Sequence, residues 1–308
     1  MLLLRHLARL GRRFKAPVLS LGNFDGVHRG HQEILRRLVA GARAIDGTAV
    51  VLTFHPHPAL VLAARAPQLI TDWRARIDLI AAEGVDAIIV ERFTPAFSRI
   101  TADDFVRRLL VEGLGVHTVV VGHRVSFGYQ RQGSAETLRQ LGARHGFAVE
   151  VVAPVAVDGM VVSSSAVRDA ISRGDLPRAR AMLGRVPSVC GRVVHGRHRG
   201  RGLGFPTANL RIAGLVLPPD GVYAVRARVH GVLRPGVANL GCNPTFGENE
   251  RSLEVHLLDF DAHLYGQRLE VQFVEQLRGE VKFSGPQALV EQIARDVSAA
   301  RQRLEEDK

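Results

Sequence analysis

The chain has 308 residues, enough for two domains of ordinary size, and its formal charge at neutral pH is +11. Its basic residues are scattered along the whole length, without a basic block or interleaved aromatic residues, which argues against a general nucleic-acid-binding protein. The two cysteines, Cys190 and Cys242, are far apart, which excludes a disulfide framework and a cysteine zinc site and predicts a reducing, cytoplasmic setting.

The N-terminal part of the chain predicts alternating strands and helices. Residues 1–14 read as a basic, amphipathic lead-in, whose apolar run is broken by Arg5 and is too short to span a bilayer. From Pro17 to about residue 183, short apolar runs such as "PVLSLG", "TAVVLTF" and "HTVVVG" alternate with helical patterns. This order is typical of a parallel sheet covered on both faces, which binds ligands at the carboxyl ends of its strands.

The pattern changes near residues 184–188. Strand-like segments then follow one another with turn residues between them, which predicts a small antiparallel barrel. The segments are "SVCGRVVHG", "GVYAVRARVHG", "RPGVANLG", "RSLEVHLLDF" and "RLEVQFVEQL". One helix closes the chain, with an apolar stripe formed by Leu289, Ile293, Val297, Ala300 and Leu304. We therefore expect two domains, residues 1–185 and 186–308.

The stretch "GNFDGVHRGH" (22–31) follows the first apolar strand. Gly22 and Gly26 allow a tight turn and close approach of the backbone, so that the amides of the next helix can face an anion. If that helix begins near His28, the imidazoles of His28 and His31 share one face. There they can donate hydrogen bonds to nucleotide phosphates and stabilise the charge that develops as pyrophosphate leaves. Either histidine alone is better explained as a polar surface residue, whereas the whole pattern predicts a phosphate site.

This stretch resembles the signature of the nucleotidyltransferase superfamily that carries His-x-Gly-His, and "VSSSAVR" (162–168) resembles the partner motif of that superfamily. Ser164 and Ser165 at a helix start can donate hydrogen bonds to a triphosphate, and Arg168 can bind it with both ends of its guanidinium. The alternative for the serine run is an ordinary helix cap, which Ser163 suits. The nucleotide-binding residues that the resemblance implies are Gly22, Phe24, Gly30, Ser164, Ser165 and Arg168, with His28 and His31 as catalytic groups.

A second glycine-rich and basic stretch, "GRVVHGRHRGRGLGFPTANL" (191–210), lies in the second half. Its glycines permit a backbone loop around phosphates, and Arg201 adds positive charge. Thr207 and Asn209 offer hard oxygen ligands two residues apart on one side of an extended segment, which suits Mg²⁺ held together with ATP. Singly, these features would be a turn and a solvated loop. The expected nucleotide-binding residues are Gly196, Gly200, Arg201, Gly204, Thr207 and Asn209.

The same stretch resembles the riboflavin kinase signature G-R-x-L-G-F-P-T-A-N, and the likeness continues in order through "GVYAV", "VANLGCNPTFG", "LEVHLLDF", "LYG" and "LRGEVKF". With both halves present, the chain resembles the bacterial bifunctional riboflavin kinase/FAD synthetase family from about residue 17 to residue 305. The resemblance implies a Rossmann-like nucleotidyltransferase domain with a parallel sheet, followed by a small antiparallel β-barrel kinase domain with a C-terminal helix. It implies phosphorylation of riboflavin to FMN in the barrel and adenylylation of FMN to FAD in the first domain, both with ATP and Mg²⁺.

The resemblance also assigns roles in the kinase half. Thr207 and Asn209 would bind Mg²⁺ with ATP, and Glu254 would be the base that takes the proton of the ribityl 5'-hydroxyl, because an alcohol attacking a phosphate needs a positioned carboxylate. Without the surrounding motif, Glu254 would be read as an outward-facing strand residue. Arg278 in "LRGEVKF" is assigned to flavin binding.

The segment "GHRVSFG" (122–128) departs from the family pattern G-x-[DN]-F-x-F-G. Arg124 stands in place of an acid or amide, which changes the local charge, and Val125 in place of phenylalanine removes aromatic surface. Phe127 matches the pattern, and both Arg124 and Phe127 are expected near the flavin. His55 stands where the family more often has an acid.

These departures leave two alternatives open beside the bifunctional enzyme. One is a riboflavin kinase whose N-terminal domain has lost adenylyl transfer, and the other is a non-catalytic flavin- or nucleic-acid-binding regulator. The leading interpretation expects small-molecule substrates and neither a nucleic-acid nor a membrane partner. The sequence does not indicate an oligomeric state.

Overall fold

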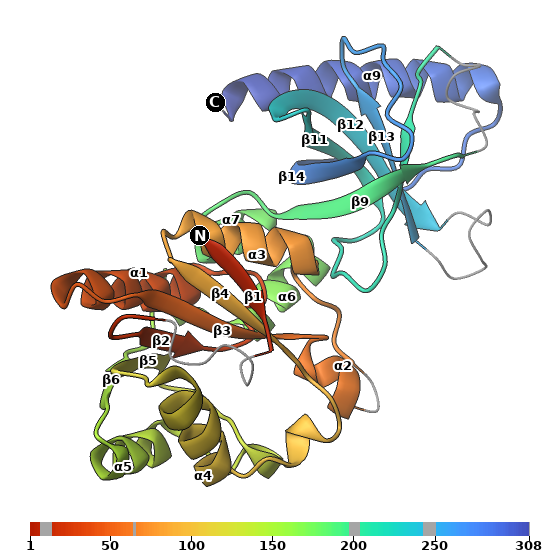
Figure 1. The fold of residues 1–308 in the computed structure, drawn as a ribbon. Coiled ribbons are helices and arrows are strands. Elements are labelled where there is room, and N and C mark those ends of the chain that lie inside the picture. Colours follow the sequence, from red (N-terminus) through yellow and green to blue (C-terminus); the bar gives the residue numbers. More distant parts are fainter. Residues whose placement is uncertain (7–13, 64–65, 197–203, 243–250, 308) are drawn as a thin grey trace. The chain divides into compact units, whose positions relative to one another are not determined.

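The computed structural model describes residues 1–6, 14–63, 66–196, 204–242 and 251–307, and the chain divides into two compact units (Figure 1). Unit 1 comprises Met1–Pro67 and Trp73–Ser164, and unit 2 comprises Gln68–Asp72 and the chain from Ser165 onward. Among the described helices, none is both long and apolar enough to cross a membrane.

Unit 1 is built on a six-stranded parallel sheet in the order β1-β4-β3-β2-β5-β6. The strands are β1 (Leu2–Arg5), β2 (Val18–Leu21), β3 (Ala49–His55), β4 (Ala87–Arg92), β5 (Thr118–Gly122) and β6 (Ala148–Val152). The helices are α1 (Arg29–Ala44), α2 (Pro58–Leu62), α3 (Trp73–Ala82), α4 (Ala102–Asp104), which continues as the π-helix η3 (Phe105–Leu114), and α5 (Ala135–His145). Short elements are η2 (Phe97–Arg99), η4 (Tyr129–Arg131) and the pair β7 (Ala156–Val157) and β8 (Met160–Val161). The predicted parallel sheet is confirmed.

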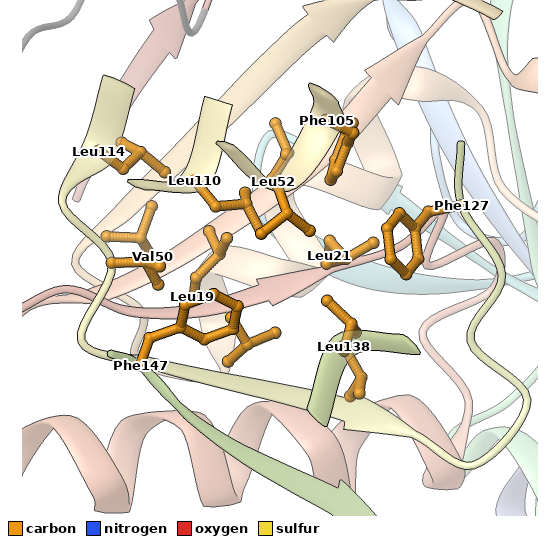
Figure 2. Close-up of a cluster of buried hydrophobic side chains, with 14 of the residues drawn as sticks. Leu19, Leu21, Val50, Leu52, Phe105, Leu110, Leu114, Phe127, Leu138 and Phe147 are labelled. Atoms are coloured by element: carbon orange, nitrogen blue, oxygen red, sulfur yellow. The ribbon is translucent and has the colours of Figure 1, made fainter. Parts of the chain in front are cut away.

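Both faces of this sheet are buried, as its continuous apolar strands predict. On one face, alternate residues of β2 and β3 pack against η3 and α5, and Figure 2 shows Leu19, Leu21, Val50 and Leu52 directed at these helices. On the opposite face, the residues between them pack against α1 and α3. The sheet is therefore a rigid middle layer, and the loops at the carboxyl ends of its strands remain for binding.

The first residues differ from their sequence prediction. Instead of an amphipathic lead-in, Leu2–Arg5 form strand β1 at the edge of the sheet, in parallel register with Ala87–Val90 of β4. The open edge of β4 offers main-chain donors and acceptors that any short extended segment can pair with. Such a strand can therefore form without a characteristic pattern of side chains in its sequence. Residues 7–13 of the predicted lead-in lie outside the described residues.

Unit 2 contains a closed six-stranded antiparallel barrel in the order β10-β13-β12-β11-β14-β9, which confirms the predicted architecture. Its strands are β9 (Ser188–Val194), β10 (Ala208–Arg211), β11 (Gly221–Val229), β12 (Val232–Cys242), β13 (Arg251–Leu257) and β14 (Arg268–Arg278). The barrel is filled by alternate residues such as Tyr223, Leu240, Leu253, Val255 and Phe273. The residues between them therefore point outward.

The described part of unit 2 also contains helices α7 (Leu176–Leu183) and α9 (Pro286–Glu306), and α6 (Ser164–Ser172) from Ser165 onward. The predicted C-terminal helix α9 covers part of the outer barrel surface, where Ala300 and Leu304 pack against Val222, Ala224 and Val237 (Figure 1). The outer faces of β10 and β13 take no part in this apolar cluster. That part of the barrel surface carries the second candidate site.

Candidate active sites

The loop between β2 and α1 has a tight and strained backbone. Phe24, Gly26 and Val27 have positive φ angles of 51°, 85° and 37°, a region that only glycine enters freely. The Val27 amide donates to the Phe24 carbonyl at 3.1 Å, and Gln32 Nε2 donates to the Val27 carbonyl at 2.9 Å. Strained residues that are fixed by their own hydrogen bonds are concentrated at binding sites, which supports the predicted phosphate loop.

His28 and His31 stack on each other at the start of α1. The helix begins at Arg29, and Nδ1 of its N-cap residue His28 accepts a hydrogen bond from the His31 amide at 3.3 Å. The two imidazoles are 3.7 Å apart between centroids and 14° from parallel. Gly30 makes room for this pair, since a Cβ at that position would lie 3.2 Å from the His28 ring. The structure thus brings both predicted histidines to one face at a helix N-terminus.

The surroundings of His31 favour the neutral form of its imidazole. Burial, and secondly the neighbouring His28, hold the pKa of His31 well below its usual value. Its Nδ1 atom is buried and has no hydrogen-bond partner among the described residues. A neutral imidazole beside a helix N-terminus offers a hydrogen bond to a ligand without charge of its own.

The lowered pKa of His31 leads to a prediction for acid stability. As the pH falls below about 6.5, the unfolded chain takes up a proton at this residue while the folded chain does not, so stability that is present above that pH is lost below it. Between about pH 6.5 and about pH 5.5, we expect the free energy of unfolding to fall by about 1 kcal/mol less in the His31→Gln variant than in the native chain. Urea unfolding followed by circular dichroism measures this difference. The control is His117→Gln, which replaces an exposed histidine, and equal losses in native chain and His31→Gln would contradict the prediction.

The predicted partner motif lies at the start of α6. Ser164 Oγ donates to the Asp25 carbonyl at 2.9 Å, so this hydroxyl fastens the start of the helix to the histidine loop. Ser165 is exposed in the first turn of α6, and Arg168 is half-buried one turn later. The division between the units falls between Ser164 and Ser165, so Ser165 and Arg168 belong to unit 2.

A cavity of about 840 Å³ lies at the carboxyl ends of β2 and β5 in unit 1. The predicted residues that line it are Gly22, Phe24, His28, Gly30, His31, Arg124, Phe127 and Ser164. Its wall also holds aromatic residues that the sequence analysis missed: Phe54, Phe93, Phe97, Phe105 and Tyr129. Several of them pack on one another, as Phe54 does on Phe93 and Phe97, each 5.8 Å away between centroids. A signal existed in "FTPAF" (93–97), where two phenylalanines directly follow a strand.

The charge of this cavity is one-sided. No aspartate or glutamate is among its described lining residues, whereas the guanidinium groups of Arg124 and Arg131 carry positive charge there, and His57 and His123 add polar rings to the histidine pair. His57, another residue that the sequence analysis missed, is buried and caps α2 by accepting from the Ala59 amide at 3.2 Å. A wall of this kind suits an anionic ligand with an aromatic ring.

The departures from the family pattern have distinct structural consequences. Arg124 is exposed at the cavity wall and forms no hydrogen bond or ion pair with another described residue. Val125 is half-buried against the core beneath η3, and Phe127 packs on Phe105 at 5.4 Å, so the loop retains apolar support. His55 lies against Trp73, with the ring centroids 4.7 Å apart and the rings tilted by 38°, and it does not line the cavity. Of these departures, Arg124 is the one that changes the cavity's charge.

Buried Arg76 joins two strand ends beside the cavity and was also missed by the sequence analysis. It is 2% exposed, and it donates to the Asn23 and Phe54 carbonyls, at 3.1 Å each. A buried arginine that satisfies main-chain carbonyls in this way holds the loops that follow β2 and β3 at a fixed separation.

The second candidate site lies on the barrel of unit 2. Thr207 and Asn209 line a cavity of about 380 Å³, together with Phe260, His263 and Tyr265. The Asn209 side chain is 7% exposed, and its Oδ1 has no hydrogen-bond partner among the described residues. A buried amide oxygen without a donor, in a cavity that Thr207 also lines, fits a hard cation such as Mg²⁺.

Strand pairing brings Glu254 beside Asn209. The two residues are directly opposite each other in β13 and β10, and both point away from the barrel interior. Side chains of such a pair have their Cβ atoms about 5 Å apart. Glu254 is half-buried and is not one of the residues that line the cavity of Thr207 and Asn209, so it is the strand register that places it next to Asn209.

Of the remaining predicted residues of unit 2, one contacts the Asn209 side chain, and the others lie elsewhere or outside the described residues. Gly196 packs against the Asn209 side chain so closely that a Cβ there would collide with it, and Gly204 is exposed. Gly200 and Arg201 lie outside the described residues. Arg278 is paired with buried Asp296 of α9, with Nη2–Oδ2 at 2.8 Å and Nε–Oδ1 at 3.0 Å. In this structure Arg278 is thus fastened to the C-terminal helix.

Comparison with known proteins gives consistent results for both halves. Residues 12–166 match the family model described as FAD synthetase, and residues 183–304 match the one described as riboflavin kinase. Proteins named bifunctional riboflavin kinase/FMN adenylyltransferase, from Pseudomonas fluorescens and Haemophilus influenzae, are 40% and 39% identical to the chain, covering 98% of it and 97% and 98% of their own lengths. A crystal structure titled macrolide-efflux protein, from Streptococcus pneumoniae, has a TM-score of 0.86 at 30% identity and covers 98% of this chain and 99% of its own.

Proposed function

The chain belongs to the family of bifunctional riboflavin kinases/FMN adenylyltransferases, and from this premise we propose that each unit carries one of the two reactions. The enzyme phosphorylates riboflavin to FMN with ATP and adenylylates FMN to FAD with a second ATP. We assign the adenylylation to the cavity of unit 1 and the phosphorylation to the outer barrel face of unit 2. The stacked pair of His28 and His31 in the acid-free wall is the observation that carries the first assignment.

In the adenylylation, an oxygen of the FMN phosphate attacks the α-phosphorus of ATP, and the bond from that phosphorus to the bridging oxygen of pyrophosphate breaks. The imidazoles of His28 and His31 donate hydrogen bonds to the phosphate oxygens on which charge grows. Ser164, Ser165 and Arg168 bind the triphosphate, and the aromatic wall around Phe127 receives the flavin ring. Because the nucleophile is already an anion, this reaction needs no general base.

In the phosphorylation, the 5'-hydroxyl of riboflavin attacks the γ-phosphorus of ATP, and ADP leaves. Glu254 takes the proton of that hydroxyl. Thr207 and Asn209 would hold Mg²⁺, which when bound neutralises triphosphate charge. Gly196 and Gly204 are assigned to the phosphates of ATP, which main-chain amides without a nearby side chain can approach closely. The register of Asn209 opposite Glu254 supports this assignment, since it brings the ATP-binding side chain and the base together.

The first experiment is chromatographic separation of flavins after incubation of the purified protein with ATP and MgCl2, once with riboflavin and once with FMN. We expect FAD in both reactions. FMN accumulating from riboflavin, with FAD in neither, would favour the alternative of a kinase with an impaired adenylyltransferase domain. If neither flavin is converted, the assignment of both reactions fails.

Arg124 provides a sharper test of that alternative. As an exposed cation on the cavity wall it contributes attraction for the phosphates of FMN or ATP. We expect Arg124→Asn to raise KM for FMN or for ATP about three- to tenfold in FAD formation, and to leave FMN formation unchanged. Steady-state kinetics of both reactions measure this. Arg139→Asn, which changes an exposed arginine on α5, is the control, and a gain of FAD formation in Arg124→Asn would show that Arg124 impairs the site.

Three further properties complete the proposal. The functional domains are residues 1–185 and 186–308, so that α6 with Ser164, Ser165 and Arg168 serves the adenylyltransferase. The partners are small molecules, neither nucleic acid nor membrane. The enzyme works in the cytoplasm, where riboflavin, ATP and Mg²⁺ are available to it.

A further inference from the structure

A third polar side chain lies in the row of Asn209 and Glu254. On β12, Asn239 is directly opposite Glu254, on the side away from Asn209. Its neighbours Ala238 and Leu240 are buried in the barrel core, so Asn239 points outward like the other two. Three adjacent strands therefore present an amide, a carboxylate and a second amide side by side on one surface.

The two amides flanking Glu254 differ in their surroundings. Asn209 is buried beside Thr207 and lines the barrel cavity. Asn239 is exposed to solvent, and its side chain forms no hydrogen bond with another described residue. Beyond Asn239 the row reaches Val222 of β11, which is buried beneath α9. Asn239 is thus the last polar position before an apolar wall.

This order has a consequence for the direction in which the two substrates meet. In-line phosphoryl transfer requires the attacking oxygen and the leaving oxygen on opposite sides of the phosphorus. If ATP is held on the Asn209 side, the alcohol approaches Glu254 from the other side, which is the side of Asn239. An amide there offers both a donor and an acceptor to a hydroxyl of the polyol chain.

We propose that Asn239 is a specificity-determining residue of the riboflavin kinase site, which recognises the hydroxyl of the ribityl chain next to the one that is phosphorylated. Its amide and the 4'-hydroxyl form a hydrogen bond that places the 5'-hydroxyl against the Glu254 carboxylate. Asn239 takes up no proton and forms no bond to phosphorus. This inference rests on the assignment of the kinase reaction to the outer barrel face.

The test compares riboflavin with an analogue that lacks the 4'-hydroxyl, as substrates of the full chain. We expect the native chain to prefer riboflavin about tenfold in kcat/KM, and Asn239→Ala to use both flavins with nearly equal kcat/KM, at the native chain's level for the analogue. KM for ATP is expected to stay unchanged. Gln302→Ala, which removes an exposed amide on α9, is the control and should retain the native preference.

Each outcome decides the proposal. A native chain that does not distinguish the two flavins, or an Asn239→Ala variant that keeps the full preference, would overturn it. Where Asn239→Ala is too slow to assay, quenching of flavin fluorescence gives the ratio of the two dissociation constants, and thermal unfolding shows whether the variant is folded. Native activity that survives Glu254→Gln would instead refute the site assignment on which the inference rests, so the two failures are distinguishable.

Discussion

Replacing Glu254 by glutamine is expected to slow riboflavin phosphorylation about 10²- to 10⁴-fold while FMN adenylylation proceeds at the native rate. Glutamine preserves the shape of the side chain but cannot accept the proton of the 5'-hydroxyl. The residue is half-buried and points away from the barrel core, so the fold and the binding of riboflavin should be largely unaffected. Flavin chromatography with riboflavin and, separately, with FMN measures both reactions in one preparation.

A matched control for this variant is Glu275→Gln, which changes an exposed glutamate of β14 on the same barrel. A second glutamate, Glu280, lies close to Gly241 of β12, where a Cβ would be 3.4 Å from its Cδ. Glu280→Gln therefore tests whether another carboxylate serves as the base. Loss of FMN formation in Glu280→Gln, with activity kept in Glu254→Gln, would transfer that role to Glu280.

The second large effect is expected at the histidine pair. His31→Gln should lower the rate of FAD formation from FMN about 10²- to 10³-fold and leave FMN formation from riboflavin intact. The glutamine removes an imidazole that is stacked 3.7 Å from His28 and edge-on to Phe24 at 5.3 Å, so both hydrogen bonding and ring position are lost. Rates under single-turnover conditions report the chemical step itself.

The exposed-histidine variant His117→Gln serves again as the control, because it changes the same residue type away from the cavity. Measuring the affinity of the variant for FMN separates binding from chemistry. An unchanged rate of FAD formation in His31→Gln would rule out a part for His31 in stabilising the departing pyrophosphate. A loss of both reactions would instead indicate a folding defect.

The architecture of both units could be predicted from the sequence, because the hydrophobic pattern of each strand and helix is contained in a short stretch of the chain. Continuous apolar runs between helical segments predicted the parallel sheet, and closely spaced strands predicted the barrel. The histidine pair was predictable as well, since His28 and His31 are three residues apart at a helix start. Strand β1 could not be predicted, because this edge strand forms through main-chain pairing with β4 and needs no particular pattern of side chains.

Contacts between distant segments could not be predicted from one sequence. Phe54 of β3 meets Phe93 and Phe97, which follow β4, in the cavity wall, and none of the three belongs to a motif. Buried Arg76 binds carbonyls 53 and 22 residues away along the chain. Asn239 belongs to the stretch "VANLGCNPTFG" that the sequence analysis quoted, but its place beside Glu254 depends on the register of two strands, which the sequence analysis did not predict.

The one-sided charge of the unit 1 cavity also affects how its substrates arrive. FMN and ATP are both anions, and a wall whose described lining residues include cations but no carboxylate attracts them before contact. Such steering increases the association rate rather than the strength of the final complex, and dissolved salt screens it over about 10 Å at 0.1 M. Riboflavin carries no charge and gains nothing from this field. A neutral flavin therefore reaches the cavity only by unguided diffusion, so the field itself favours capture of the phosphorylated flavin over its precursor.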